Sequence, residues 1–214
     1  MMRKLSVSSI DFTETHVSVT LEDGRILHDR LSRNPDLLKA SAEQRLEWTL
    51  LDDGLVSWPQ LGEKVTLDAR WLLWEELCKQ ANDEAKAKDF KLDKLPPRSQ
   101  EIVALWRLEA DGYNGGFMQF FCNWGEENCR LALSALQAIG ADATYAIVAR
   151  QREILERPKD HPNLKSYDDI WNLLTTEERE EIGGKLDLAF WEAADEIPKL
   201  AALHYYEGWG AGDE

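Results

Sequence analysis

The sequence predicts an α+β protein, in which a small N-terminal antiparallel β-meander with helices precedes an all-α acidic helical domain. Three observations predict this division. Apolar and polar residues alternate in three short segments near the N-terminus, as in half-buried strands. A charged stretch then leads to Pro96 and Pro97, and no helix can continue across these prolines. Beyond them, apolar residues recur every three or four positions, which is the helical period.

The alternating segments are residues 5–10, 16–21 and 26–31. Asp23, Gly24 and Arg25 provide a tight turn between the last two, so we expect an antiparallel meander.

Further on, Ser41 and Gln44 have the spacing of a capping box, which predicts a helix over residues 42–51. Residues 55–59 should be extended, because Trp58 precedes Pro59 and a residue before proline avoids the helical region. A longer helix is expected over residues 68–88.

We therefore divide the chain into four parts. Residues 1–80 form the small α+β domain, residues 81–97 a charged, proline-containing linker, residues 98–207 the helical domain, and residues 208–214 a tail. Charge is unequal across the linker. Residues 1–80 hold 14 acids and 10 bases, net −4, whereas residues 81–214 hold 26 acids and 15 bases, net −11.

In the helical domain, Ile102, Leu105 and Trp106 share one face of a first helix, and Asp111-Gly112 is expected to end it. A turn at residues 114–116 leads to a short aromatic helix over residues 117–124. Gly125 separates it from an alanine-rich helix that Gly140 stops.

Asp142 caps the next predicted helix, in which Ala143, Ala146, Ile147 and Ile154 share a face, and residues 158–165 form a loop. Thr175 and Glu178 make a second capping box, and the segment they open is expected to bend at Gly183-Gly184. Helices over residues 186–194 and 198–206 complete the domain.

The formal net charge of −15 and the pI of about 4.7 disfavour binding to nucleic-acid backbone or anionic lipid and favour a basic partner. Cys78, Cys122 and Cys129 form no CxxC pair, so we expect buried, inert thiols and a cytoplasmic protein. No segment approaches the roughly 20 apolar residues of a membrane helix.

The centre of the helical domain is a run of asparagine, glycine and aromatic residues. Two interpretations remain open. The run is a structural hinge, in which the glycines allow a sharp reversal and the phenylalanines fill the core. Alternatively, its amides Asn114, Gln119 and Asn123 line a polar pocket for a ligand. The residues concerned are Asn114, Gly115, Gly116, Phe117, Gln119, Phe120 and Asn123.

Acidic residues also recur at helical spacing in the last third of the chain. Carboxylates at i and i+4 stand about 6 Å apart along a helix, a spacing comparable to that of a phosphate array. Glu180 and Asp187, seven positions apart, are expected to share a face as well. The alternative is a solvated acidic face that maintains solubility. The candidates for partner binding are Glu177, Glu178, Glu180, Glu181, Glu192, Asp195 and Glu196.

An enzyme would need a coherent site, and the sequence does not predict one. The four histidines are scattered without an HExxH pattern, and Cys122 and Cys129 lack a second pair of ligands. We therefore expect no catalytic residues, no metal and no cofactor.

Part of the N-terminal region resembles a small bacterial domain of unknown function, with a DGR turn, a proline-leucine segment, an alanine-to-tryptophan helix and a WPxLDE ending. The matching residues are 23–25, 35–38, 42–48 and 58–61. Gly62 stands where that family has an aspartate.

The helical domain resembles the bacterial DNA-mimic protein family over about residues 98–207. Its signature NGGFxQ(F/Y)FxN is matched by residues 114–123, and the alanine-rich helix with its IGA turn follows at residues 132–141. The closing leucine-aspartate-aromatic helix corresponds to residues 186–191. The resemblance implies a helical acidic protein, one of whose relatives imitates duplex DNA and occupies the DNA-binding face of a transcription regulator.

Together, these observations predict a non-enzymatic protein-binding module. Its acidic helical surface is expected to occupy the nucleic-acid-binding face of a basic protein, such as a transcription regulator, without binding nucleic acid or membrane itself. The alternatives are a ligand-binding or catalytic module around the NGGF loop, and an immunity or antitoxin-like protein that uses the same surface.

Overall fold

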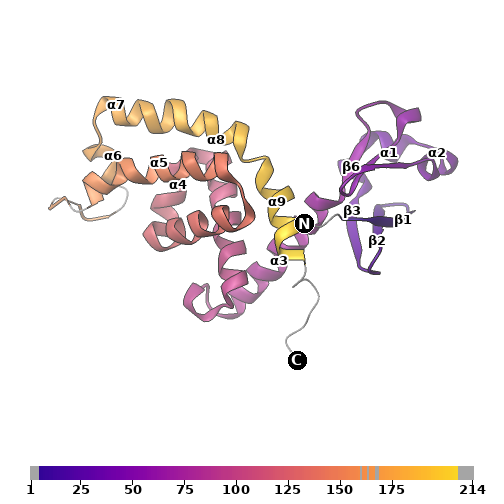
Figure 1. Cartoon of the computed structure of the whole chain (residues 1–214), viewed down its shortest axis with the longest axis horizontal. Helices are drawn as coiled ribbons and strands as arrows, with labels where there is room; N and C mark the ends of the chain where they lie inside the picture. The colour runs from indigo at the N-terminus through magenta and orange to yellow at the C-terminus, as the bar shows by residue number, and fades with distance from the viewer. Residues whose placement is uncertain (1–4, 160, 163, 167–168, 207–214) are drawn as a thin grey trace. The chain divides into compact units, whose positions relative to one another are not determined.

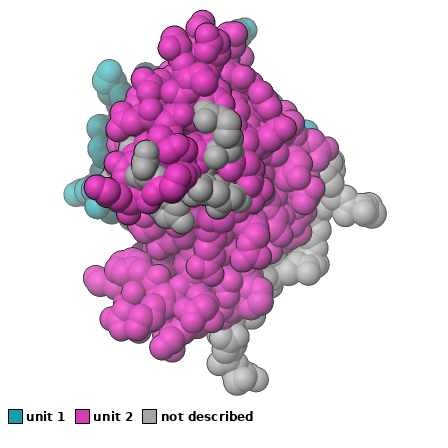
Figure 2. Space-filling model, turned by 90° about the vertical axis from the view of Figure 1, so that its left-hand side faces the viewer, with its two compact units in different colours: residues 1–77, 205–214 teal, residues 78–204 magenta. Residues whose placement is uncertain are grey.

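The computed structural model describes residues 5–159, 161–162, 164–166 and 169–206. Contacts divide the chain into two compact units (Figures 1 and 2). Unit 1 comprises the residues up to Leu77 together with Tyr205 and Tyr206, and unit 2 comprises residues 78–204. The described residues contain no helix that is both long enough and apolar enough to span a bilayer.

Unit 1 contains two three-stranded antiparallel sheets. The first has the order β1-β2-β3 and confirms the predicted meander. Its alternating pattern buries Val17, Val19 and Leu21 on one face. The second sheet has the order β4-β5-β6. The strands are β1 (Val7–Phe12), β2 (His16–Leu21), β3 (Ile26–Arg30), β4 (Thr49–Asp52), β5 (Leu55–Ser57) and β6 (Thr66–Asp68).

Short helices connect the strands of unit 1, and one of them is shorter than predicted. The capping box of Ser41 and Gln44 is confirmed, but α2 ends at Leu46 instead of residue 51. The indole N–H of Trp58 donates to the carbonyl of Arg45 at 2.9 Å, so a distant residue caps the helix end. The helices are η1 (Leu31–Arg33), α1 (Pro35–Lys39), α2 (Ala42–Leu46) and η2 (Pro59–Leu61).

The DGR turn of unit 1 holds the last described residue of the chain. The Arg25 guanidinium stacks 3.9 Å from the ring centre of Tyr206 and donates to its carbonyl oxygen at 2.9 Å. Asp23 forms an ion pair with Arg25 and accepts a hydrogen bond from the Tyr206 hydroxyl. The hydrogen bonds from Arg25, joined by that of Tyr206, lower the pKa of Asp23 to about 2.

Helix α3 (Ala69–Ala87) confirms the helix expected over residues 68–88, and the division between the units falls within it, after Leu77. This point lies a few residues before the expected linker. The expected linker contains a short helix, η3 (Leu92–Lys94), and two of its residues, Leu92 and Leu95, are buried.

Helix α4 (Pro97–Ile139) contains the signature segment and runs through the position where we expected it to end. The prediction that Asp111-Gly112 terminates it is wrong. A Cβ atom on Gly112 would lie 2.5 Å from the Phe190 ring, so this glycine permits close helix packing. The helical path is instead broken at Gly115 and Gly116, and again at Gly125. Gly140, with φ of 78°, caps the helix as predicted.

Helices α5 (Asp142–Lys159), η5 (Glu180–Leu186) and α8 (Asp187–Ala193) of unit 2 pack against α4. Helix α5 continues through Pro158, so the loop expected from that residue begins later than predicted. Its buried face carries Thr144, Val148 and Leu155 together with Ile154 of the predicted face, whereas the predicted alanines, Ala143 and Ala146, are exposed. The helices are α5 (Asp142–Lys159), α6 (Ile170–Leu173), α7 (Thr176–Arg179), η5 (Glu180–Leu186), α8 (Asp187–Ala193) and α9 (Glu196–Tyr205).

Helices α7, η5 and α8 follow one another without a gap and form a single rod along one side of unit 2 (Figure 1). Its capping box at Thr175 and Glu178 is confirmed. Gly183 and Gly184, where a bend was predicted, lie in a π-helix, η5, through which the rod continues. The predicted tail of residues 208–214 lies outside the described residues.

Candidate functional site

The first candidate is the NGGF signature, whose amides converge on a carboxylate within α4. Gln119 Nε2 donates to Asp111 Oδ1 at 2.7 Å. Asn123 Nδ2 and Trp124 Nε1 donate to Asp111 Oδ2 at 3.0 and 2.7 Å. Asp111 therefore joins the helical turn before the break to the aromatic helix after it.

A second carboxylate closes the break from another helix. Asp187 Oδ1, at the start of α8, accepts from the backbone N–H of Phe117 at 3.0 Å and from Gln151 Nε2 at 2.7 Å. Because Phe117 opens the helical segment after the glycines, Asp187 acts as an N-cap supplied by a distant part of the chain. Burial raises the pKa of Asp187, and its two hydrogen bonds oppose this shift.

The two glycines of the signature are required by this packing. A Cβ atom on Gly116 would lie 2.1 Å from Asp187 Oδ2, and Gly116 has φ of 77°. A Cβ atom on Gly115 would lie 2.1 Å from Gln119 Oε1. The signature glycines thus allow side chains to approach the backbone where a larger residue would collide with them.

The aromatic part of the signature fills the core. Phe117, Phe120 and Phe121 are all buried, and the ring centre of Phe117 lies 6.0 Å from that of Phe120 and 6.1 Å from that of Phe121. Asn114 is exposed, and its amide lies 3.4 Å from Gln119 Oε1. The structure therefore places the signature residues at a hinge, with the amides of Gln119 and Asn123 bonded to the protein itself.

A buried arginine adjoins this network. The Arg107 guanidinium lies 3.8 Å from the Trp124 ring centre and donates to Asn128 Oδ1 at 2.7 Å. Burial lowers the pKa of Arg107 to about 10, while the charge of Asp111 opposes the shift. Sequence reasoning missed Arg107, Asp111 and Gln151, although the i, i+4 spacing of Arg107 and Asp111 offered a signal.

The second candidate is the acidic rod, by which we mean residues 176–193 of α7, η5 and α8. Three of the predicted carboxylates, Glu177, Glu180 and Glu192, are exposed. Among the described residues, none of the three is within salt-bridge distance of a basic side chain. They are therefore available to a partner.

The other four predicted carboxylates have partners within the protein. Glu178 accepts a hydrogen bond from the backbone N–H of Thr175 in the capping box. Glu181 accepts from Arg150 Nε at 2.8 Å, and this hydrogen bond lowers the pKa of Glu181. Asp195 accepts from the Tyr113 hydroxyl at 2.9 Å. Glu196 accepts from Thr144 Oγ1 at 2.9 Å. In the two pairs with i, i+4 spacing, Glu177 with Glu181 and Glu192 with Glu196, the first carboxylate is thus free and the second is engaged.

The prediction that Glu180 and Asp187 share an acidic face is wrong. Asp187 is turned toward Phe117 and Gln151, whereas Glu180 is exposed. The π-helix between them has a wider turn than an α-helix, so a spacing of seven residues no longer returns to the same face.

Arginines of α5 neutralise part of the acidic surface. Arg150 pairs with Glu153 and Glu181, and Arg152 pairs with Glu126 and Glu156. Hydrogen bonds to Glu181 and Glu153 raise the pKa of Arg150. Of the predicted set, Glu181 is thereby paired with an arginine, whereas Glu177, Glu180 and Glu192 form no ion pair among the described residues.

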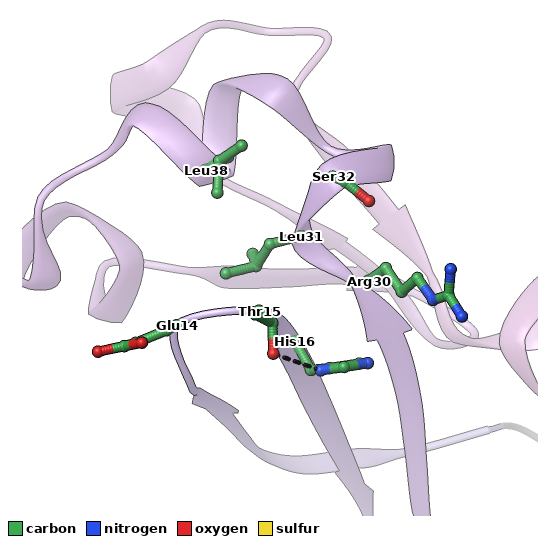
Figure 3. Close-up of a pocket in the computed structure, with 7 residues that line it drawn as sticks. All are labelled: Glu14, Thr15, His16, Arg30, Leu31, Ser32 and Leu38. Atoms are coloured by element: carbon green, nitrogen blue, oxygen red, sulfur yellow. Dashed lines mark hydrogen bonds between the residues drawn. The ribbon is translucent and has the colours of Figure 1, made fainter.

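Unit 1 contains a separate open hollow of about 410 Å³ between the β2 hairpin and α1 (Figure 3). Leu31 and Leu38 form its apolar part, and the Thr15 hydroxyl lies 2.8 Å from His16 Nδ1. Its other lining residues are Glu14, Arg30 and Ser32. None of these residues belongs to the predicted sites.

The cysteines and acidic clusters define no metal centre within the described residues. Cys78 and Cys129 are buried, as predicted, and Cys122 is half-buried. Burial raises the pKa of Cys129 to about 12, so this thiol is held in its unreactive protonated form.

The glycine hinge and its two carboxylates thus lie in the acidic helical part of the chain, where residues 81–214 carry a net charge of −11. The chain belongs to the family described as DMP19-like protein, whose model matches residues 93–208, more than half of its length. Residues 7–75 match a second family, described as a protein of unknown function (DUF2442). Both resemblances expected from the sequence are thereby confirmed. Comparisons with curated proteins and with solved structures gave no match.

Proposed function

We propose that the protein is a non-enzymatic binding module whose acidic rod occupies the nucleic-acid-binding face of a basic partner, such as a transcription regulator. Membership of the DNA-mimic family supports this role. The observation that carries it is the exposure of Glu177, Glu180 and Glu192 on one rod, where none of them forms a salt bridge with a described basic side chain.

The spacing of these carboxylates suits a site that binds phosphates. At about 1.5 Å per residue, Glu177 and Glu180 are separated by roughly 4.5 Å along the rod. Glu192 lies twelve positions beyond Glu180, across the π-helix η5 and toward the other end of the rod, a distance of several steps of about 3.4 Å along one DNA strand. A groove that binds phosphates at several steps can therefore meet both ends of the rod.

Long-range electrostatics support the same partner class. Residues 81–214 carry a net charge of −11, against −4 for residues 1–80, so the field is stronger around the helical unit. Such a field speeds encounter with a basic surface and repels nucleic acid.

The hydrogen bonds of the signature amides favour this proposal over a ligand or catalytic site at the NGGF loop. Gln119 and Asn123 both donate to Asp111 at hydrogen-bond distance, and only Asn114 is exposed without a strong bond. A ligand would have to displace Asp111 to reach these amides. An immunity or antitoxin-like protein would use the same rod, so the identity of the captured partner separates that role from DNA mimicry.

The test is capture of a partner from the source organism at low salt, followed by elution with rising salt and DNA competition with the eluted protein. The variant E177Q/E180Q/E192Q removes the three free charges. A matched control, E22Q/E47Q/E63Q, removes three exposed charges of unit 1. At about 0.5 kcal/mol for each exposed pair, the rod variant should bind roughly tenfold more weakly and with a flatter salt dependence.

The control should bind like the wild type. Equal binding by the wild type and the rod variant at every salt concentration would refute the carboxylate mechanism. A captured protein that binds no nucleic acid, such as a toxin enzyme, would refute DNA mimicry.

A further inference from the structure

The outward face of α8 exposes two large apolar side chains. Leu188 is 52% exposed and Trp191 is 43% exposed. Residues three apart on a helix are neighbours on its surface, so these side chains form one patch. The opposite face of α8 packs into the core through Phe190, which is 2% exposed. A face that only meets water would instead be polar.

A tyrosine from α4 adjoins this patch. Trp191 Nε1 donates to the carbonyl of Gly112 at 2.8 Å, which fixes the indole against the turn that carries Tyr113. Tyr113 is 40% exposed, and its hydroxyl donates to Asp195 Oδ1 at 2.9 Å. The ring of Tyr113 also packs 5.9 Å from that of Phe190.

These contacts hold both aromatic rings in place before any partner arrives. Rigid tryptophan and tyrosine side chains lose little conformational entropy on binding, and they are the residues that dominate protein interfaces. The patch is therefore both exposed and rigid, as the anchor residues of protein interfaces are.

Charge around the patch decides what can cover it. Glu192 follows Trp191 on α8, Asp195 lies in the turn after the helix, and both residues are exposed. A second copy of the chain would bring these acids against its own, and an anionic membrane would be repelled in the same way. A basic protein segment meets neither penalty.

We propose that Tyr113, Leu188 and Trp191, bordered by Glu192 and Asp195, form a docking surface for a partner segment in which an aliphatic side chain is flanked by lysine or arginine. This docking surface rests on the proposed function in one respect, the basic character of the partner. It adds an apolar anchor that selects among basic proteins, which charge alone cannot do.

The probe is a synthetic amphipathic helical peptide of leucine and lysine, compared with a peptide in which alanine replaces every leucine. Both peptides have the same length and charge, so only the first supplies a large aliphatic side chain. The variant is Leu188→Ser, which changes no charge and replaces a half-exposed side chain. The control is Leu51→Ser, at an exposed leucine of unit 1.

Titration by calorimetry and the indole NMR signal of Trp191 measure binding. We expect the leucine peptide to shift the Trp191 signal of the wild type. We expect it to bind the Leu188→Ser variant roughly tenfold more weakly than the wild type, because the variant has lost the burial of one leucine. Leu51→Ser should bind normally, and the alanine peptide should bind all three proteins alike.

Two results would overturn the docking surface: equal binding of the leucine peptide to wild type and Leu188→Ser, or binding that leaves the Trp191 signal unshifted. The test is separable from that of the carboxylates. Replacing Glu177 and Glu180 by glutamine tests the acidic rod away from the patch, so one proposal can fail while the other stands.

Discussion

Replacing Gly116 by alanine should strongly destabilise unit 2. Gly116 has φ of 77° and ψ of −176°, a region that is nearly exclusive to glycine and costs another residue about 1–3 kcal/mol. The new methyl group would also lie 2.1 Å from Asp187 Oδ2. Moving Asp187 away would leave the Phe117 amide and the Gln151 side chain without their acceptor, at a further cost of about 1–3 kcal/mol.

Together these effects give roughly 2–6 kcal/mol, a large fraction of the roughly 5–15 kcal/mol by which a typical protein is stable. Urea unfolding followed by circular dichroism at 222 nm measures the loss, because most helices belong to unit 2. The matched control is Gly183→Ala, where the nearest atom to the new methyl, Trp171 Cη2, lies at 3.9 Å. That variant should be as stable as the wild type or gain up to about 1 kcal/mol.

If Gly116→Ala unfolds at the same urea concentration as Gly183→Ala, the signature glycine is not required for the Asp187 cap. Normal stability together with a normal Asp187→Ala variant, which removes the acceptor, would further show that the cap contributes nothing. Both results would refute the structural role assigned here to the NGGF hinge.

Two further predictions concern other carboxylates. Asp111→Ala should destabilise the protein by about 2–3 kcal/mol in thermal unfolding, because it leaves donors of Gln119, Asn123 and Trp124 unpaired. The control Glu127→Ala, at an exposed position, should not destabilise it. Equal melting temperatures of the two variants would contradict this prediction. Arg25 and Tyr206 lower the pKa of Asp23 from 3.8 to about 2, so its contribution is present above pH 4 and lost as the pH falls toward 2. The stability difference between wild type and Asp23→Asn should therefore shrink over that interval in urea titrations, and a difference independent of pH would disprove the coupling.

Features that depend on residues close in sequence could be predicted. The two capping boxes, at Ser41 and Thr175, form because the cap and its partner are three residues apart. The glycine stop at Gly140 and the alternating strands of the first sheet are equally local. The fold class and both family resemblances follow from such patterns.

Features that depend on distant residues could not be predicted. Helix α2 ends at Leu46 because Trp58 donates to the carbonyl of Arg45 across 13 positions. A glycine such as Gly112 commonly ends a helix, but here it lies within α4 and permits Phe190 to pack against that helix. In both cases a tertiary contact overrides the local preference of the backbone.

By itself, the sequence determined how much negative charge the helical unit carries and the helical spacing of its carboxylates. Only the tertiary structure decided which of those carboxylates are free. Glu181 is neutralised by an arginine 31 positions away and Asp195 is bonded to a tyrosine 82 positions away, while Glu177, Glu180 and Glu192 remain exposed. The reason is that hydrogen bonds and ion pairs require contact within a few ångströms, and helix packing, not spacing along the chain, brings those partners together.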